Sequence, residues 1–289
     1  DNHELLLLGR KKIPELKGSF LYFDHSVDEN KLSINDCETV IHCAGLAHQL
    51  AGANLSSASQ KHYYNSNVLT TKKILNICIR SGVKKIIYVS TIKVNASVDS
   101  ETVLHDDAAG FDKNDLYART KFEAEQEIIL SCKKHNIEYI IFRPVIMYGS
   151  RLKGNLKKLD KFFELFKFSI LPFGCLNNPR SLLSVTNFCD LILLACYKRV
   201  PSGVYIACDD EVFSTSQIIN LLSKKNANFC LNLKVPKYFL YLISTGRLGV
   251  LFQKLDAKLV ADNSKAKHVF GWAPQKSFAS ILKDNDNHG

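Results

Sequence analysis

Short, continuous apolar runs alternate with helical segments in the first half of the chain, and this alternation constrains the fold most. Helices are expected at Tyr64–Ser81, where apolar residues recur at helical spacing, and at Leu116–Asn136. The runs, too short for helices, predict strands at Glu4–Leu8, Ser19–Phe23, Thr39–Cys43, Lys85–Ser90 and Ile137–Arg143. Apolar strands separated by helices form a parallel sheet covered on both faces. The sequence therefore predicts an α/β fold with a doubly wound parallel sheet.

The pattern loosens after about residue 150. Loops containing Pro and Gly separate further helical segments, predicted at Leu156–Phe168, Asn187–Lys198, Ser216–Lys224 and Tyr238–Phe252. A length of 289 residues suits one large α/β domain, or a domain with an added lobe. We therefore expect a sheet domain over 1–150 and a smaller C-terminal lobe over 151–289, partly interleaved with the first.

The chain is basic, with Lys and Arg outnumbering Asp and Glu by 38 to 28, for a net charge of +10. Its basic residues are spread as doublets, such as Lys84–Lys85 and Lys133–Lys134, instead of being clustered. Spread lysines favour a solvated surface over a nucleic-acid footprint, which needs a basic patch or stripe. We expect no nucleic-acid partner, and the charge also suits an anionic small-molecule substrate.

The nine cysteines are odd in number and never form a Cys-x-x-Cys pair, so neither a zinc site nor a disulfide framework is predicted. The longest apolar runs, such as Ile137–Phe142, are far shorter than the roughly 20 residues that span a bilayer. Tyr238–Phe252 is apolar, but it contains Gly246 and Arg247 and favours a packed amphipathic helix. We therefore expect a cytoplasmic protein with no membrane span and no bound metal.

The sharpest chemical pattern is the pair Tyr117 and Lys121 at the start of a predicted helix. Their i, i+4 spacing places both side chains on one helix face. A phenol, with an ordinary pKa of about 10, is a poor acid or base at neutral pH, and a neighbouring ammonium favours its phenolate form. On its own this pair is common, and a surface contact explains most such matches.

Two hydroxyls strengthen the pair. Ser90 and Thr91 lie at the carboxyl end of the predicted strand Lys85–Ser90, and ligands of parallel sheets bind just beyond the carboxyl ends of strands. A strand-end hydroxyl and Tyr117 on the following helix can therefore converge on one substrate oxygen. His42 and His48 flank a predicted turn, where a histidine is more often structural.

The motifs occur in a fixed order along the chain. They are Val40–Leu46 (VIHCAGL), Tyr63–Val68 (YYNSNV), Ser90–Asn95 (STIKVN), Tyr117–Lys121 (YARTK), Arg143–Gly149 (RPVIMYG), Asn178–Asn187 (NPRSLLSVTN), Ala261–Ala266 (ADNSKA) and Phe270–Trp272 (FGW). In this order the chain resembles the extended short-chain dehydrogenase/reductases, within them the NAD-dependent epimerase/dehydratase family and its UDP-glucose 4-epimerase-like members. The sequences of Ser90–Asn95 and Asn178–Asn187 are similar to those of bacterial UDP-4-keto-6-deoxy-hexosamine 4-reductases. The resemblance implies a Rossmann-like fold.

The resemblance also implies roles. Tyr117 would be the acid–base at the sugar C4 oxygen, Lys121 would lower its pKa and hold the nicotinamide ribose, and Thr91 would hydrogen-bond the same oxygen. The implied cofactor-binding residues are Asp24, Ala44, Gly45, Leu46, Asn67, Tyr117, Lys121, Pro144 and Val145. The implied substrate-binding residues are Thr91, Asn155, Arg180 and Asp262. Plainer interpretations stay open, because Asp24 can simply end its strand, Arg180 can lie on the surface and Asp262 can cap a helix.

One family feature is missing from the sequence. The first strand and the glycine-rich G-x-x-G-x-x-G turn, which binds the cofactor pyrophosphate, do not occur. We expect either about 30 further N-terminal residues or a truncated gene product, and weak dinucleotide binding by the chain as it stands. Gly9 to Lys12 (GRKK) follow the first predicted strand and could accept a 2′-phosphate, so NAD is preferred only slightly over NADP.

Two functional hypotheses follow. The first is an NAD(P)-dependent epimerase or 4-keto reductase acting at C4 of a UDP-sugar in surface polysaccharide biosynthesis. The family resemblance implies that it could form a homodimer. The second is a non-catalytic or inactive truncated relative that binds a sugar-nucleotide or a protein partner. The presence of Thr91, Tyr117 and Lys121 together favours the enzyme.

Overall fold

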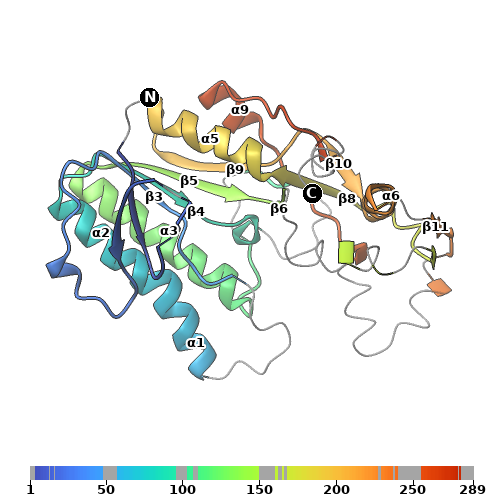
Figure 1. Ribbon diagram of the computed structural model, residues 1–289, viewed down its shortest axis with the longest axis horizontal. Helices are drawn as coiled ribbons and strands as arrows, with labels where there is room; N and C mark the ends of the chain where they lie inside the picture. The colour runs from blue at the N-terminus through green and yellow to red at the C-terminus, as the bar shows by residue number, and fades with distance from the viewer. Residues whose placement is uncertain are drawn as a thin grey trace. The chain divides into compact units, whose positions relative to one another are not determined.

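A computed structural model describes residues 4–12, 14–15, 17–47, 57–95, 103–106, 110–149, 160–161, 165, 168–226, 229–236, 238–239, 255–278 and 280 (Figure 1). The chain forms two compact units that exchange segments. The first comprises Asp1–Ser90, Asp112–Ile141 and Pro201–Gly203, and the second comprises Thr91–Phe111, Phe142–Val200 and Val204–Gly289. The division into domains at residue 150 stays a prediction.

The first unit contains four of the predicted strands and the first part of the fifth. β1 (Leu6–Gly9) and β2 (Ser19–Tyr22) pair in parallel as a two-stranded sheet. β3 (Thr39–His42) pairs in parallel with β4 (Lys85–Val89), in a register that sets His42 opposite Tyr88. The sheet continues to β5 (Glu138–Pro144) and β9 (Gly203–Ala207) in the order β3-β4-β5-β9 (Figure 1). The chain passes from the first unit to the second within β5 and again within β9.

The helices of the first unit begin and end at residues that favour helix capping and chain reversal. α3 (Leu116–His135) starts at Asp115, whose carboxylate accepts hydrogen bonds from the amides of Tyr117 and Ala118, and ends at Asn136 in the left-handed conformation. α2 (Thr70–Arg80) lies beside α3 and ends just before Gly82, whose φ of +70° suits glycine. Both helices therefore stop where their local sequence allows the chain to turn.

One helix differs from its prediction. The helix expected over Tyr64–Ser81 starts earlier, as α1 (Ser57–Tyr64), and continues through a π-helical segment, Asn65–Leu69, into α2. In this segment the Thr70 amide donates to the Asn65 carbonyl, five residues back. Such π turns are rare and occur often at functional sites. Here the segment carries Asn67.

The second unit has smaller sheets. β8 (Pro179–Ser184) pairs in parallel with β6 (Ile146–Tyr148) and antiparallel with β10 (Val212–Ser214). β7 (Phe168–Leu171) pairs in parallel with β11 (Phe229–Asn232). The predicted helix Leu156–Phe168 is therefore wrong at its last residue, because Phe168 begins a strand whose pairing partner lies far along the chain.

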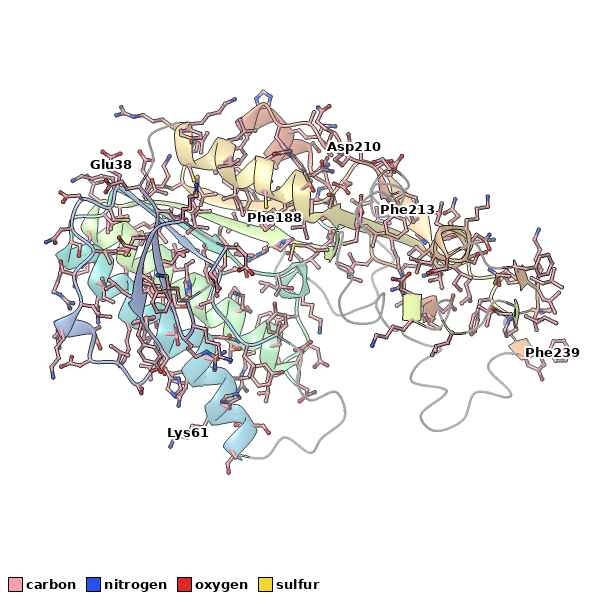
Figure 2. All side chains as sticks on the ribbon, in the orientation of Figure 1. Glu38, Lys61, Phe188, Asp210, Phe213 and Phe239 are labelled. Atoms are coloured by element: carbon pink, nitrogen blue, oxygen red, sulfur yellow. The ribbon has the colours of Figure 1, made fainter. Side chains whose placement is uncertain are left out.

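Aromatic residues fill the core of the second unit. The helices are α5 (Val185–Tyr197), α6 (Thr215–Lys225) and α9 (Ser264–Phe270). Phe188 of α5, labelled in Figure 2, meets the ring of Phe142 edge-on at 5.8 Å, and Phe270 of α9 lies 5.5 Å from the same ring. Among the residues that the structure describes, no helix combines the length and the apolar character needed to cross a membrane.

Candidate active site

The first turns of α3 carry Tyr117 and Lys121, as predicted. Asp115 fixes the helix start through its bonds to the Tyr117 amide at 3.0 Å and the Ala118 amide at 3.1 Å. Tyr117 is partly exposed, whereas Lys121 is only 3% exposed. The i, i+4 spacing on a capped helix places both side chains on one face, at the end of the helix that is electrostatically positive.

Lys121 occupies an unusual environment for a cation. Its ammonium donates a hydrogen bond of 2.6 Å to the carbonyl of Val89 and lies 4.1 Å from the centre of the Tyr88 ring. Burial lowers the pKa of Lys121 from 10.5 to about 7, against the opposing influence of Glu125 and Cys43. The amine is thus poised to carry or release a proton near neutral pH.

The two strand-end hydroxyls have different partners. The Ser90 hydroxyl donates to the buried carboxylate of Glu125, so it is occupied within the first unit. Thr91 is buried in the second unit and starts the short 3-10 helix Ile92–Val94, where its hydroxyl accepts from the Lys93 amide at 3.4 Å. The predicted convergence of Thr91 and Tyr117 on one oxygen stays a prediction.

A turn after β3 is braced from α3. Asn67 is fully buried; its side-chain oxygen accepts from the Leu46 amide at 2.7 Å, and its side-chain nitrogen donates to the Thr120 hydroxyl at 2.9 Å. A Cβ placed on Gly45 would lie 3.0 Å from the Asn67 side-chain oxygen and 3.7 Å from the Lys121 ammonium. Ala44 and Gly45 are exposed. The turn is therefore an exposed stretch with small side chains next to the buried Lys121 amine. Such a surface suits a polar cofactor that lies along it.

His42 is buried beneath this turn. Its Nε2 lies 2.8 Å from the Thr71 hydroxyl, which itself donates to the Asn67 carbonyl. Burial, and then the charge of Lys121, lower the pKa of His42 to about 3. The imidazole is therefore neutral at physiological pH, as a structural histidine would be, whereas His48 lies outside the described residues.

The other predicted cofactor residues lie outside the turn that follows β3. Asp24 follows β2, and its carboxylate accepts from the Ser26 hydroxyl at 2.6 Å, the Ser26 amide at 2.7 Å and the Tyr22 hydroxyl at 2.6 Å. The Ser26 hydroxyl, then the other two bonds, hold the pKa of Asp24 well below its usual range. Pro144 and Val145 are buried in the second unit. A cofactor role for these three residues stays a prediction.

The predicted substrate residues lie in the second unit. Pro179–Ser181 runs beside Ala257–Ala261: the amide of Leu259 donates to the Pro179 carbonyl at 3.0 Å, and the amide of Ser181 donates to the Leu259 carbonyl at 2.8 Å. This pairing brings the stretches that carry Arg180 and Asp262 side by side. Asn155 lies outside the described residues.

Asp262 already has local partners. Its carboxylate accepts from the hydroxyl and, at 2.9 Å, from the amide of Ser264 at the start of α9, and lies 3.3 Å from the His105 ring. These bonds, that from the Ser264 hydroxyl first, lower the pKa of Asp262. Asp262 therefore holds the first residue of α9 from the position before the N-cap residue, Asn263, and its contact with a nucleotide-sugar stays a prediction.

Comparison with known proteins identifies the family. The sequence profile of the NAD dependent epimerase/dehydratase family matches residues 15–207 of this chain. The UDP-glucose 4-epimerase of Vibrio cholerae is 30% identical over 264 residues, covering 88% of this chain and 77% of that enzyme. The chain belongs to the NAD dependent epimerase/dehydratase family. The family resemblance drawn from the ordered motifs is thus confirmed.

Other members extend the comparison. The N-acetyl-alpha-D-glucosaminyl-diphospho-ditrans,octacis-undecaprenol 4-epimerase of Escherichia coli O157:H7 is 28% identical over 185 residues, covering 62% of this chain and 52% of that enzyme. The UDP-glucuronic acid 4-epimerase of Bacillus cereus, solved with NAD, superposes with a TM-score of 0.74 at 19% identity, over 98% of this chain and 89% of that one. The UDP-glucose 4-epimerase of Thermotoga maritima, solved with UDP-glucose, gives 0.74 at 18% identity, over 99% and 91%. These likenesses confirm the predicted α/β, Rossmann-like fold.

Sequence reasoning missed two residues that surround Lys121 in the structure, Glu125 and Tyr88. Glu125 continues the Tyr117–Lys121 spacing by another four residues, so the sequence itself places it near the same helix face. Tyr88 had no such signal, because its contact with Lys121 joins a strand to a helix and depends on tertiary packing.

Proposed function

We propose that this protein is an NAD-dependent enzyme that inverts the configuration at C4 of a UDP-sugar. The observation that carries the proposal is the buried Lys121, one helical turn from Tyr117 and beneath the bare turn at Gly45. A purely structural helix has no need of a desolvated amine there, because burying a cation is costly. The curated relative at 30% identity, a UDP-glucose 4-epimerase, supports a UDP-sugar as the substrate, and the relative at 28% identity, an undecaprenol-linked sugar 4-epimerase, supports reaction at C4.

In this proposal, Tyr117 removes the proton of the sugar C4 hydroxyl and later returns it. The Lys121 ammonium and the positive end of α3 favour the phenolate, so the Tyr117 oxygen can accept a proton near neutral pH. NAD, when bound, would supply the acceptor and donor of the C4 hydride. Thr91 would donate a hydrogen bond to the same sugar oxygen and orient it.

The residues that would hold the cofactor fall in two groups. Ala44, Gly45 and Leu46 would lie along it, with Asn67 fixing their turn and Lys121 hydrogen-bonding the nicotinamide ribose. Asp24 would bind at the adenine end, and Pro144 and Val145 would line the nicotinamide pocket.

The substrate would be held by residues of the second unit. Arg180 would pair with the UDP diphosphate through its forked guanidinium, and Asn155 and Asp262 would contact the nucleotide-sugar.

Reduction of a 4-keto sugar remains the alternative direction for the same groups, because it moves the same proton and hydride. An epimerase retains its nucleotide and needs no added reductant, whereas a reductase consumes NADH or NADPH in proportion to product. NADP as cofactor, a homodimer, a cytoplasmic location and a place in surface polysaccharide biosynthesis stay predictions.

Turnover of a panel of UDP-hexoses and UDP-N-acetylhexosamines by the full-length protein with NAD tests the proposal. Tyr117→Phe should lower kcat at least ~100-fold, because a positioned acid–base group contributes that much. Tyr64→Phe is the matched control, since Tyr64 is exposed on α1. The mechanism is supported if wild type and Tyr64→Phe interconvert the C4 epimers and Tyr117→Phe does not. A rate for Tyr117→Phe equal to that of wild type would refute it. Binding of UDP-sugar with no turnover by any protein would instead support the non-catalytic hypothesis.

A further inference from the structure

The ring of Tyr88 forms one wall of the Lys121 site. Tyr88 is 0% exposed near the carboxyl end of β4, and the Lys121 ammonium lies 4.1 Å from its ring centre. A cation within about 6 Å of an aromatic ring centre is attracted by the negative face of the ring, and most strongly where water is excluded. Both partners are buried here, so the contact operates in its strongest range.

The ring is held from the neighbouring strand. Tyr88 lies directly opposite His42 in the parallel pairing of β3 and β4, and the two ring centres are 5.1 Å apart at an angle of 40°. His42 is neutral, because burial lowers its pKa to about 3. The ring of Tyr88 therefore meets a single cation among these neighbours, the ammonium of Lys121.

Several ionisable groups face Lys121 from the elements around it. Glu125 lies on its own helix, Cys43 and His42 come from β3 and the turn that follows, and Tyr88, which Tyr117 also influences, comes from β4. Burial opposes the charged amine, and Glu125 and Cys43 support it. The face of Tyr88 adds a support that does not itself ionise near neutral pH, since burial raises the pKa of its hydroxyl well above the usual value.

We propose that Tyr88 is a positioning residue, whose ring face holds the Lys121 ammonium under the Gly45 turn and stabilises its charge. The part that Lys121 plays in catalysis rests on the proposed function, but the contact between Tyr88 and Lys121 does not. Tyr88 touches neither the sugar nor the cofactor in this proposal and acts through the amine alone.

Titration of Lys121 by NMR tests the contact without turnover. Full-length protein labelled with 13C at the lysine side chains is titrated, and the Lys121 signal is identified by its loss in Lys121→Arg. Tyr88→Leu should move the titration midpoint to lower pH by about one pH unit, the size expected for a desolvated cation–π contact. Tyr88→Phe, which keeps the ring and removes only the hydroxyl, should leave the midpoint unchanged.

A second series covers the case in which Tyr88→Leu does not fold. Phenylalanine analogues with increasing numbers of ring fluorines at position 88 weaken the negative face at nearly constant volume. The Lys121 midpoint should fall stepwise with fluorination, whereas a constant midpoint across the series overturns the proposal. In the active enzyme the pH at which kcat declines on the alkaline side should fall in parallel. Absence of turnover in wild type would refute the proposed function and leave the NMR result to decide on Tyr88.

Discussion

Asn67 ties the turn after β3 to the helix that carries the candidate catalytic pair, so its removal should destabilise the fold measurably. Asn67→Ala deletes the acceptor of the Leu46 amide, bonded at 2.7 Å, and the donor to the Thr120 hydroxyl, bonded at 2.9 Å. The third bond, to the Leu46 carbonyl at 3.4 Å, is long and adds little.

The size of the loss follows from these bonds. Each well-formed hydrogen bond contributes about 1 kcal/mol net, and a partner left buried without water costs about 1–3 kcal/mol. Asn67 is 1% exposed, so water does not readily replace its amide. We therefore expect Asn67→Ala to lower the free energy of unfolding by about 2–4 kcal/mol.

Urea unfolding followed by far-UV circular dichroism measures this loss as a lower midpoint at an unchanged slope. Asn76→Ala is the matched control, because Asn76 lies on α2 and makes one long bond of 3.4 Å to Glu29. It should lose no more than ~0.5 kcal/mol. Equal midpoints for the two variants would show that Asn67 does not brace the turn.

Two further predictions concern ionisable groups near Lys121. Because the folded chain protonates His42 only near pH 3 and the unfolded chain near pH 6.5, stability should fall as pH drops through this window. The fall should be steeper in wild type than in His42→Phe by about 1.4 kcal/mol per pH unit, and parallel unfolding curves would contradict it. Glu125→Gln should lower the pKa of Lys121 below about 7 in the NMR titration, since the carboxylate supports the amine. Glu123→Gln, at a partly exposed position on the same helix where the carboxylate pairs with Arg119, should not change it.

The sequence was sufficient where the structural signal is local. α3 was predicted within one residue of its observed end, because Asp115 can accept the first amides of the helix and Asn136 tolerates the left-handed conformation. β4 was predicted because a buried parallel strand is apolar on both sides, whatever its neighbours are.

Prediction failed where partners are distant. Ser57–Tyr64 has no apolar stripe, and only Tyr63 is buried in α1, so periodicity could not reveal this helix. β7 and β11 are four-residue strands that owe their structure to each other across a long separation in sequence. The same limit applies to the site, since Tyr117 and Lys121 share one helix, whereas Tyr88 reaches Lys121 from a strand.

The buried groups around Lys121 constrain one another. If His42 were charged it would repel Lys121, and the depressed pKa of His42 shows that the shared burial favours a single cation. That cation has the Val89 carbonyl, the Tyr88 ring and the charge of Glu125 in its support. A lysine supported on several sides yet desolvated has a pKa of about 7 instead of 10.5, where small changes in its surroundings alter its charge most. Substitutions that do not touch the sugar or the cofactor should therefore change the pH dependence of this site before they change its fold.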